Sequence, residues 1–307
     1  AIYFTQGNDL IISNCYLRNN HANYGGAVYA NTRKGDTTLN LLITNTVVTQ
    51  NTATSAGGGI YCINWDNINL NLSHCTITGN TRSSISLLNA YDSDYKPTKD
   101  SYITVTNSVL THNSGEYGGG IKIGSSTSHP KYYRVSIRNT AIKENIAEKS
   151  GGGIYCLTPR VTYDIARSSI SKNSAQYAAG IFSSIRTDIE THIDSCLLDS
   201  NIATSGSGGA IYFSSSEKIS PKLTINASKF RGNRATYSGG GIYLSHGYSS
   251  TPVVSITNSQ FISNSADEQF GGGLYYKYDF ESDALLHIDN CRFSGNSSKI
   301  GGAIVMY

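Results

Sequence analysis

The sequence predicts an all-β protein, a right-handed parallel β-helix with about ten three-sided coils of roughly 31 residues each. Three observations predict it. One motif recurs through all 307 residues, apolar residues alternate with a period of two inside each copy, and no stretch has a helical period. Because one coil cannot bury its apolar face alone, we expect residues 1–307 to form a single solenoid. The right hand is the one expected for parallel crossovers.

Each repeat contains the motif Phe-x-x-Asn, in which an aliphatic residue can replace the phenylalanine. Glycines follow the asparagine in most repeats. An interior column with one amide per coil predicts a ladder of hydrogen bonds, so we interpret these asparagines as structural. They are spaced by 28 to 33 residues and are Asn20, Asn51, Asn80, Asn113, Asn145, Asn173, Asn201, Asn233, Asn264 and Asn296.

Three short strands are expected in each repeat. Apolar residues lie mostly ten, and always eight and three, positions before the asparagine, and another aliphatic residue follows the glycines. The alternation breaks about six residues before the asparagine and again at the asparagine, which predicts a corner at each point. With strands about 4.8 Å apart, ten coils would form a rod roughly 45–50 Å long.

An aromatic column is expected to point outward from the third strand. One interpretation is cross-strand packing that stabilises the sheet. The other is a binding surface for sugar rings or for a neighbouring rod, because tyrosine combines an apolar face with a polar group. The column contains Tyr29, Tyr61, Tyr155, Phe182, Tyr212, Tyr243 and Tyr275.

The segments between the third strand and the next repeat contain all five prolines, which sheet interiors exclude. We therefore expect loops along one edge of the rod, where binding residues are often found. The longest loop covers about residues 83–101. Its residues Asp92, Asp94 and Asp100 lack the spacing of a calcium loop, so a solvated loop is the preferred interpretation.

Catalytic carboxylate pairs are not evident. Asp194 and Asp289 share a column but are three coils apart, about 14 Å, which exceeds the roughly 5–9.5 Å of glycosidase pairs. The seven histidines show no metal-ligand spacing. We therefore expect no enzyme, no metal and no cofactor. No neighbouring coil supplies Arg, Lys and His in a recognisable catalytic arrangement beside the acidic clusters Asp279, Glu281 and Asp283, or Asp188, Glu190 and Asp194.

All six cysteines fall on positions expected to face inward. Those in one column are at least two coils apart, roughly 9–10 Å, which is too far for a disulfide. A disulfide between Cys62 and Cys75 remains an alternative. The preferred interpretation is that the cysteines are buried thiols that act as small apolar side chains. The remaining cysteines are Cys15, Cys156, Cys196 and Cys291.

Charge and hydropathy argue against a nucleic-acid partner and against a membrane-spanning helix. A net charge of +3 with 15% charged residues is too weak for a nucleic-acid footprint, and no apolar run approaches about 18 residues, so no transmembrane helix is expected. Sequons at Asn71 and Asn226 should lie outward or at a corner, available for glycosylation. Asn296 also lies in a sequon, but as a ladder residue it should not carry glycan.

The alternation of Gly-Gly-Ala/Gly-aliphatic with Phe-x-x-Asn along the whole chain resembles the polymorphic outer-membrane protein family of chlamydial autotransporter passengers. The second motif is literal at 230–233, 261–264 and 293–296. The resemblance implies display at the cell surface, attached to the outer membrane, or secretion, and it implies adhesion to host cells.

The expected function is therefore an extracellular stalk or adhesive passenger that presents its loop edge and aromatic face to a host-cell or matrix surface, with glycans as one class of partner. Two alternatives stay open. The chain starts and stops inside a repeat without a polar cap, so we expect either a segment of a longer chain or rods that stack end to end into a filament. The other alternative is a β-helix polysaccharide lyase or glycosidase.

Overall fold

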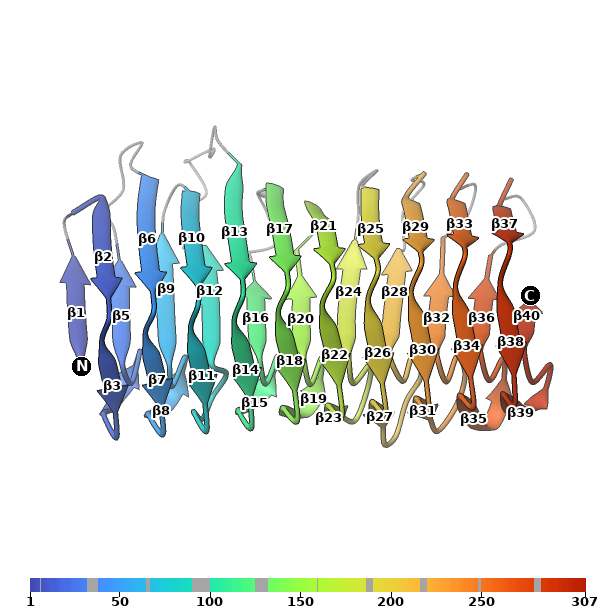
Figure 1. Ribbon diagram of the computed structural model, residues 1–307, viewed down its shortest axis with the longest axis horizontal. Coiled ribbons are helices and arrows are strands. Elements are labelled where there is room, and N and C mark those ends of the chain that lie inside the picture. Colours follow the sequence, from blue (N-terminus) through green and yellow to red (C-terminus); the bar gives the residue numbers. More distant parts are fainter. Residues whose placement is uncertain are drawn as a thin grey trace.

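The computed structural model describes residues 1–5, 7–31, 38–64, 67–89, 100–124, 132–158, 160–185, 190–215, 220–247, 250–278 and 283–307. These residues form one parallel β-helix (Figure 1), which confirms the predicted fold. In Figure 1 the near strands run downward and the far strands upward as the chain advances from left to right. This sense of winding is right-handed.

Three long sheets form the sides of the coil, and every pairing within them is parallel and in register with the repeat. In the described residues the β1 sheet contains β1 (Ile2–Thr5), β5 (Val28–Asn31), β9 (Ile60–Asn64), β12 (Ile85–Asn89), β16 (Ile121–Gly124), β20 (Ile154–Leu157), β24 (Ile181–Ile185), β28 (Ile211–Ser215), β32 (Ile242–Ser245), β36 (Leu274–Lys277) and β40 (Ile304–Met306).

The β2 sheet and the β3 sheet hold the strands that precede each asparagine. The β2 sheet contains β2 (Asp9–Ser13), β6 (Thr38–Thr44), β10 (Asn67–Ser73), β13 (Ser101–Thr106), β17 (Tyr132–Arg138), β21 (Arg160–Ala166), β25 (Glu190–Asp194), β29 (Lys222–Asn226), β33 (Val253–Thr257) and β37 (Leu285–Asp289). The β3 sheet contains β3 (Tyr16–Arg18), β7 (Val47–Thr49), β11 (Thr76–Thr78), β14 (Val109–Thr111), β18 (Ala141–Lys143), β22 (Ser169–Ser171), β26 (Leu197–Asp199), β30 (Lys229–Arg231), β34 (Gln260–Ile262) and β38 (Arg292–Ser294).

A short fourth strand follows the asparagine in nine of the described coils, and the sequence pattern does not predict it. It lies where the chain passes from the β3 sheet to the glycines. These strands are β4 (His21–Tyr24), β8 (Thr52–Ala56), β15 (Ser114–Tyr117), β19 (Ile146–Ser150), β23 (Ser174–Ala175), β27 (Ile202–Ala203), β31 (Arg234–Ala235), β35 (Ser265–Phe270) and β39 (Ser297–Ile300).

Residues with left-handed backbone make the corners. In the second coil they are Asn45 (φ 49°), Gln50 (φ 54°) and Gly57 (φ 63°). The first confirms the predicted corner six residues before the asparagine. The second corrects the other corner, because the left-handed residue immediately precedes the asparagine instead of being the asparagine. This shift leaves the amide of Asn51 free to point into the coil, where it is fully buried.

The asparagine column is a continuous ladder of hydrogen bonds. The side-chain oxygen of Asn201 accepts both the backbone N–H (3.1 Å) and the amide Nδ2 (3.0 Å) of Asn173 in the preceding coil. The Nδ2 atom of Asn201 donates to Asn233 Oδ1 and to the carbonyl of Ile170, both at 2.9 Å. The same pattern links consecutive asparagines from Asn20 to Asn296. Each amide therefore satisfies a backbone group that the corner leaves unpaired.

Hydroxyl groups five residues before the asparagine act in a similar way at the other corner. Ser228 Oγ accepts the backbone N–H of Cys196 at 3.1 Å, and Ser259 Oγ accepts that of Ser228 at 3.1 Å. This explains why the column consists of Ser, Thr and Cys, whose small side chains fit a buried corner. A polar interior is compatible with folding here because the polar groups are paired.

None of the six cysteines is bridged, so the alternative of a Cys62–Cys75 disulfide is wrong. Burial raises the pKa of the Cys62 and Cys156 thiols to about 12, which keeps them protonated and unreactive near neutral pH. The expectation of six buried thiols needs one correction. Cys15 is exposed and Cys291 is partly buried, because each lies in the outermost coil at one end of the described rod.

No helix in the described part of the chain is long and apolar enough to cross a bilayer.

The ladder makes a direct prediction about stability. Asn201→Ala removes two donor bonds and leaves the backbone and side-chain N–H groups of Asn173 without their acceptor. We expect a loss of about 3–5 kcal/mol in the free energy of unfolding, measured by urea denaturation. The matched control is Asn23→Ala, whose exposed amide accepts one bond from Thr54 and should cost less than about 1 kcal/mol. Equal losses for the two variants would contradict the structural role.

Candidate functional site

The predicted aromatic column forms two stacks of rings along the β1 sheet. Tyr3, Tyr29 and Tyr61 form the first stack, with ring centroids 5.0 and 5.7 Å apart. Ser86 and Lys122 interrupt the column in the next two strands. The second stack contains Tyr155, Phe182, Tyr212, Tyr243 and Tyr275, with consecutive centroids 4.6–5.3 Å apart.

Three of the four neighbouring pairs in the second stack are nearly parallel, and the Tyr243–Tyr275 pair is tilted by 36°. The planes of Phe182 and Tyr212 differ by 10°, and those of Tyr212 and Tyr243 by 2°. Phe182 and Tyr212 therefore have both ring faces against their neighbours and direct an edge outward. Sugar rings stack on an open aromatic face, so the inner rings of this stack offer little surface for that type of contact. Cross-strand packing is the role that the geometry supports.

A second set of rings covers part of the column. The residue immediately before the first glycine is Tyr24, Tyr117 or Phe270 in three coils, and these rings lie 5.3, 4.7 and 5.6 Å from Tyr61, Tyr155 and Tyr275. As a result Tyr61, Tyr155 and Tyr275 are only 5–7% exposed. Burial also raises the pKa of Tyr61 and Tyr155 to about 12. A column predicted to face outward is thus largely buried at these three positions.

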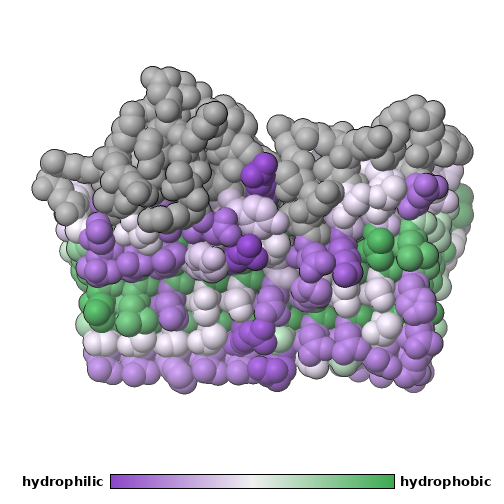
Figure 2. Space-filling model, turned by 90° about the horizontal axis from the view of Figure 1, so that it is seen from above, coloured by the Kyte–Doolittle hydropathy of each residue, from purple (hydrophilic) through white to green (hydrophobic). Residues whose placement is uncertain are grey.

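Two rings of the second stack are more open than Tyr155 and Tyr275. Ser207 and Ser238 precede the glycines in the coils of Tyr212 and Tyr243, and these two rings are partly exposed. Figure 2 shows residues of similar hydropathy aligned in bands along the length of the molecule. The exposed part of the column is a narrow strip of ring edges.

A network of charged residues crosses the outer face of the β2 sheet. Lys222 Nζ lies 3.3 Å and His192 Nε2 3.5 Å from the carboxylate of Glu190. Arg138 is paired with Asp164, which lies beside His192 in the strand register. The neighbouring coil thus contributes a cation, Lys222, to the acidic residues of this region.

The network extends toward β13, where the sheet face is hollowed. Arg134 Nε lies 3.0 Å from Asp100 Oδ2. The hollow has a volume of about 330 Å³. Its outward lining residues come from β13, β17, β21 and β25 and are Tyr102, Thr104, Arg134, Ser136, Thr162, Asp164, Glu190 and His192. We call this hollow the β2-sheet groove.

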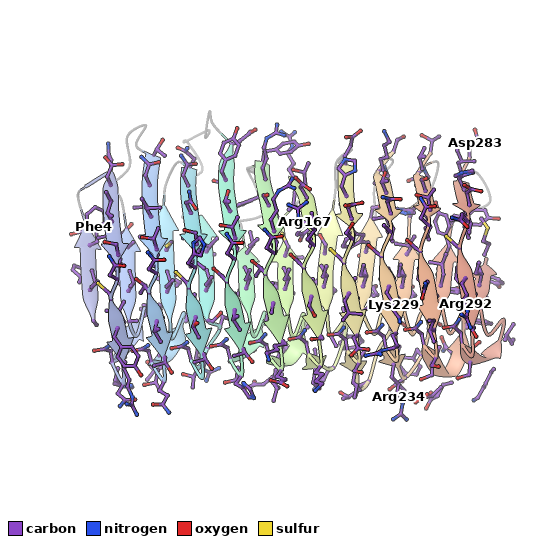
Figure 3. The ribbon with its side chains drawn as sticks, in the orientation of Figure 1. Phe4, Arg167, Lys229, Arg234, Asp283 and Arg292 are labelled. Atoms are coloured by element: carbon purple, nitrogen blue, oxygen red, sulfur yellow. The ribbon has the colours of Figure 1, made fainter. Side chains whose placement is uncertain are left out.

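A second, shallower depression follows the corner between the β2 and β3 sheets. Its lining includes Arg167 and Lys229, both labelled in Figure 3, and small residues such as Ala141 and Ser169. The guanidinium of Arg167 donates to Asn139 Oδ1 at 3.0 Å. This depression is more open to solvent than the β2-sheet groove.

The predicted glycosylation sites and acidic residues lie at the following positions. Asn71 is exposed on β10, whereas Asn226 is partly buried and its amide donates to Asp194 at 2.7 Å. Asp194 and Asp289 lie on β25 and β37, separated by two intervening strands, as expected. Asp92, Asp94, Asp188, Asp279 and Glu281 lie outside the described residues. No group of three or more His, Cys, Asp or Glu side chains that could hold a metal occurs in the described ranges.

His246 is a buried titratable residue inside the coil. Its Nδ1 atom lies 3.2 Å from Ser215 Oγ, and its ring meets Tyr276 edge-on at 5.6 Å. It lines a narrow internal cavity with Leu244 and Phe213. Burial lowers the pKa of His246 to about 4. The imidazole is therefore neutral near pH 7 and serves as a packed interior side chain.

Coils of this shape, joined by a ladder of buried amides, define a β-solenoid repeat protein. Within that class, residues 45–63 and 227–245 match the Chlamydia polymorphic membrane protein repeat. The chain thus carries this repeat at two distant places, and the predicted resemblance is confirmed. No curated protein and no solved structure matches the chain.

Both matched segments cover the same part of a coil. Residues 227–245 include β30, β31, the glycines at 239–241 and β32, and residues 45–63 cover the equivalent β7, β8 and most of β9. The β2-sheet strands, which carry the groove, fall outside both matches. A chain with this repeat and this fold fits a surface-exposed passenger domain, and the family is associated with the outer membrane.

The stacked rings predict that removing Tyr243 lowers the stability of the protein. Tyr243→Ser deletes contacts with Tyr212 and Tyr275, so we expect a loss of about 2–3 kcal/mol in the free energy of unfolding, measured by urea denaturation. Tyr3→Ser is the control, because Tyr3 is 75% exposed and stacks on one side only. It should cost less than about 1 kcal/mol. Comparable losses would show that the column contributes little to stability.

Burial of His246 predicts a pH dependence of stability. Its pKa is about 4 in the folded state and about 6.5 when unfolded, so only the unfolded chain binds a proton between these values. Stability should be complete above about pH 6.5 and should fall by about 2–3 kcal/mol as pH falls toward 4.5.

The His246→Gln variant isolates this contribution. The free energy of unfolding, measured in urea at pH 7 and pH 4.5, should change less with pH in His246→Gln than in the parent. His287→Gln, at an exposed position on β37, should keep the parental dependence. If all three proteins respond equally to pH, His246 is not the source.

Proposed function

We propose that the chain is the rigid, adhesive stalk of a cell-surface passenger protein, and that it binds a host-cell or matrix surface. The observation that carries the proposal is the family repeat, matched at two distant places in one continuous β-helix. The family is membrane-associated, and an uninterrupted β-helix extends its lateral faces away from any point of attachment.

The mechanics of the rod support a stalk. Every coil is joined to the next by parallel sheets and by the ladder, so bending the rod would strain many hydrogen bonds together. Such a rod holds its lateral faces at fixed positions for contact with a surface. The predicted loop edge belongs to the same proposal, although most of its residues lie outside the described ranges.

The charges in the β2-sheet groove favour binding over catalysis. A glycosidase needs a carboxylic acid whose pKa is raised so that it can donate a proton. The hydrogen bond from Lys222 lowers the pKa of Glu190 instead, and Asp164 is paired with Arg138. Both carboxylates are thus placed as acceptors. We therefore propose a binding function and no hydrolytic step.

The proposal is tested on the purified chain. Fluorescently labelled protein should bind cultured animal cells saturably, and excess unlabelled chain should displace it. Electron microscopy and sedimentation at low and high concentration should show discrete rods. Cells that bind no more of this chain than of a control protein of similar charge would contradict adhesion. Filaments that grow with concentration would instead favour the alternative of a structural subunit.

A further inference from the structure

The β2-sheet groove combines an exposed aromatic ring with polar side chains from four consecutive strands. Its floor is formed by the half-buried hydroxyl side chains Thr104, Ser136 and Thr162. Charged side chains from adjacent strands border this floor. At about 330 Å³ the groove falls within the roughly 300–1,000 Å³ of small-ligand sites.

Tyr102 supplies the aromatic face that the tyrosine column lacks. It is 47% exposed on β13, and its neighbours in the strand register are Asn69 and Arg134. Among the described rings none stacks on Tyr102, in contrast to Tyr212 or Tyr243. An unstacked ring at the rim of a polar hollow can contact the apolar face of a sugar while its hydroxyl stays in water.

The charges around the groove balance. Three cations, Arg134, Arg138 and Lys222, are each paired with one of three anions, which are Asp100, Asp164 and Glu190. His192 adds a ring that contacts Glu190. These three ion pairs together carry no net charge, and they offer both donors and acceptors. This arrangement suits a ligand with many hydroxyl groups better than an anionic ligand.

We propose that the β2-sheet groove binds a neutral oligosaccharide lying along the rod axis across β13, β17, β21 and β25. These four consecutive strands span about 14 Å. One sugar packs on Tyr102, and the following hydroxyls bond to Arg134, Asp164, Glu190 and His192. The inference rests on the proposed adhesive function, and it names the site and the class of ligand.

The test is isothermal titration calorimetry of the whole chain with defined hexasaccharides. The neutral probes are cellohexaose, maltohexaose, mannohexaose and chitohexaose, and the anionic probes are hexagalacturonate and a heparin hexasaccharide. We expect at least one neutral probe to bind more tightly than about 1 mM. Tyr102→Ala and Glu190→Gln should each weaken that binding at least about tenfold, whereas Tyr102→Phe, which keeps the ring, should retain it.

Tyr16→Ala is the matched control, because Tyr16 is 62% exposed but lies on β3, away from the groove. It should leave binding unchanged, and all variants should melt at the parental temperature. Binding of anionic probes alone, binding of no probe, or equal losses in Tyr102→Ala and Tyr16→Ala would each overturn the proposal.

Cell binding separates this inference from the proposed function. If Tyr102→Ala loses the neutral hexasaccharide but still binds cells like the parent, adhesion stands and the groove is not its site. If the parent binds the hexasaccharide through Tyr102 but does not bind cells, the groove stands and the adhesive function fails. Loss of both activities in Tyr102→Ala supports both.

Discussion

The hydrogen bonds of the asparagine ladder are the constraint on which the rest of the structure depends. A left-handed residue just before each asparagine turns the chain, and the turn leaves a backbone N–H facing along the rod. Only the amide of the next coil reaches it. Each coil therefore relies on its successor for a buried partner, and this dependence keeps strands, glycines and aromatic rings in the same place from coil to coil.

Much of this could be predicted from the sequence, because the ladder imposes a column that is visible in the chain itself. The alternation at residues such as Ile43 and Val48 predicted the β2 and β3 sheets. The short fourth strand could not be predicted, since a segment such as Ser174–Ala175 has two residues and no alternation. The second corner was misplaced by one residue because residues as different as Gln50 and Gly79 occupy it.

The candidate site could be predicted from the sequence less completely than the fold. The position of the tyrosine column was predicted, but ring orientation depends on packing, and packing directs the inner ring faces toward one another. The groove was missed because its ion pairs join residues 26 to 34 positions apart, such as Arg138 with Asp164 and Arg134 with Asp100. Comparing Glu190 and Lys222 as members of one column would have revealed their opposite charges.

The ladder also has a consequence for how such a chain changes its length during evolution. Its bonds stay within 2.9–3.1 Å although the spacing between consecutive asparagines varies from 28 to 33 residues. Insertions and deletions between asparagines are thus absorbed without disturbing the bonds. Recombination between two repeats at equivalent asparagines would add or remove whole coils and would rejoin one amide to another. Such recombination would lengthen or shorten the rod in unit steps and would exchange outer faces, while the interior stays the same.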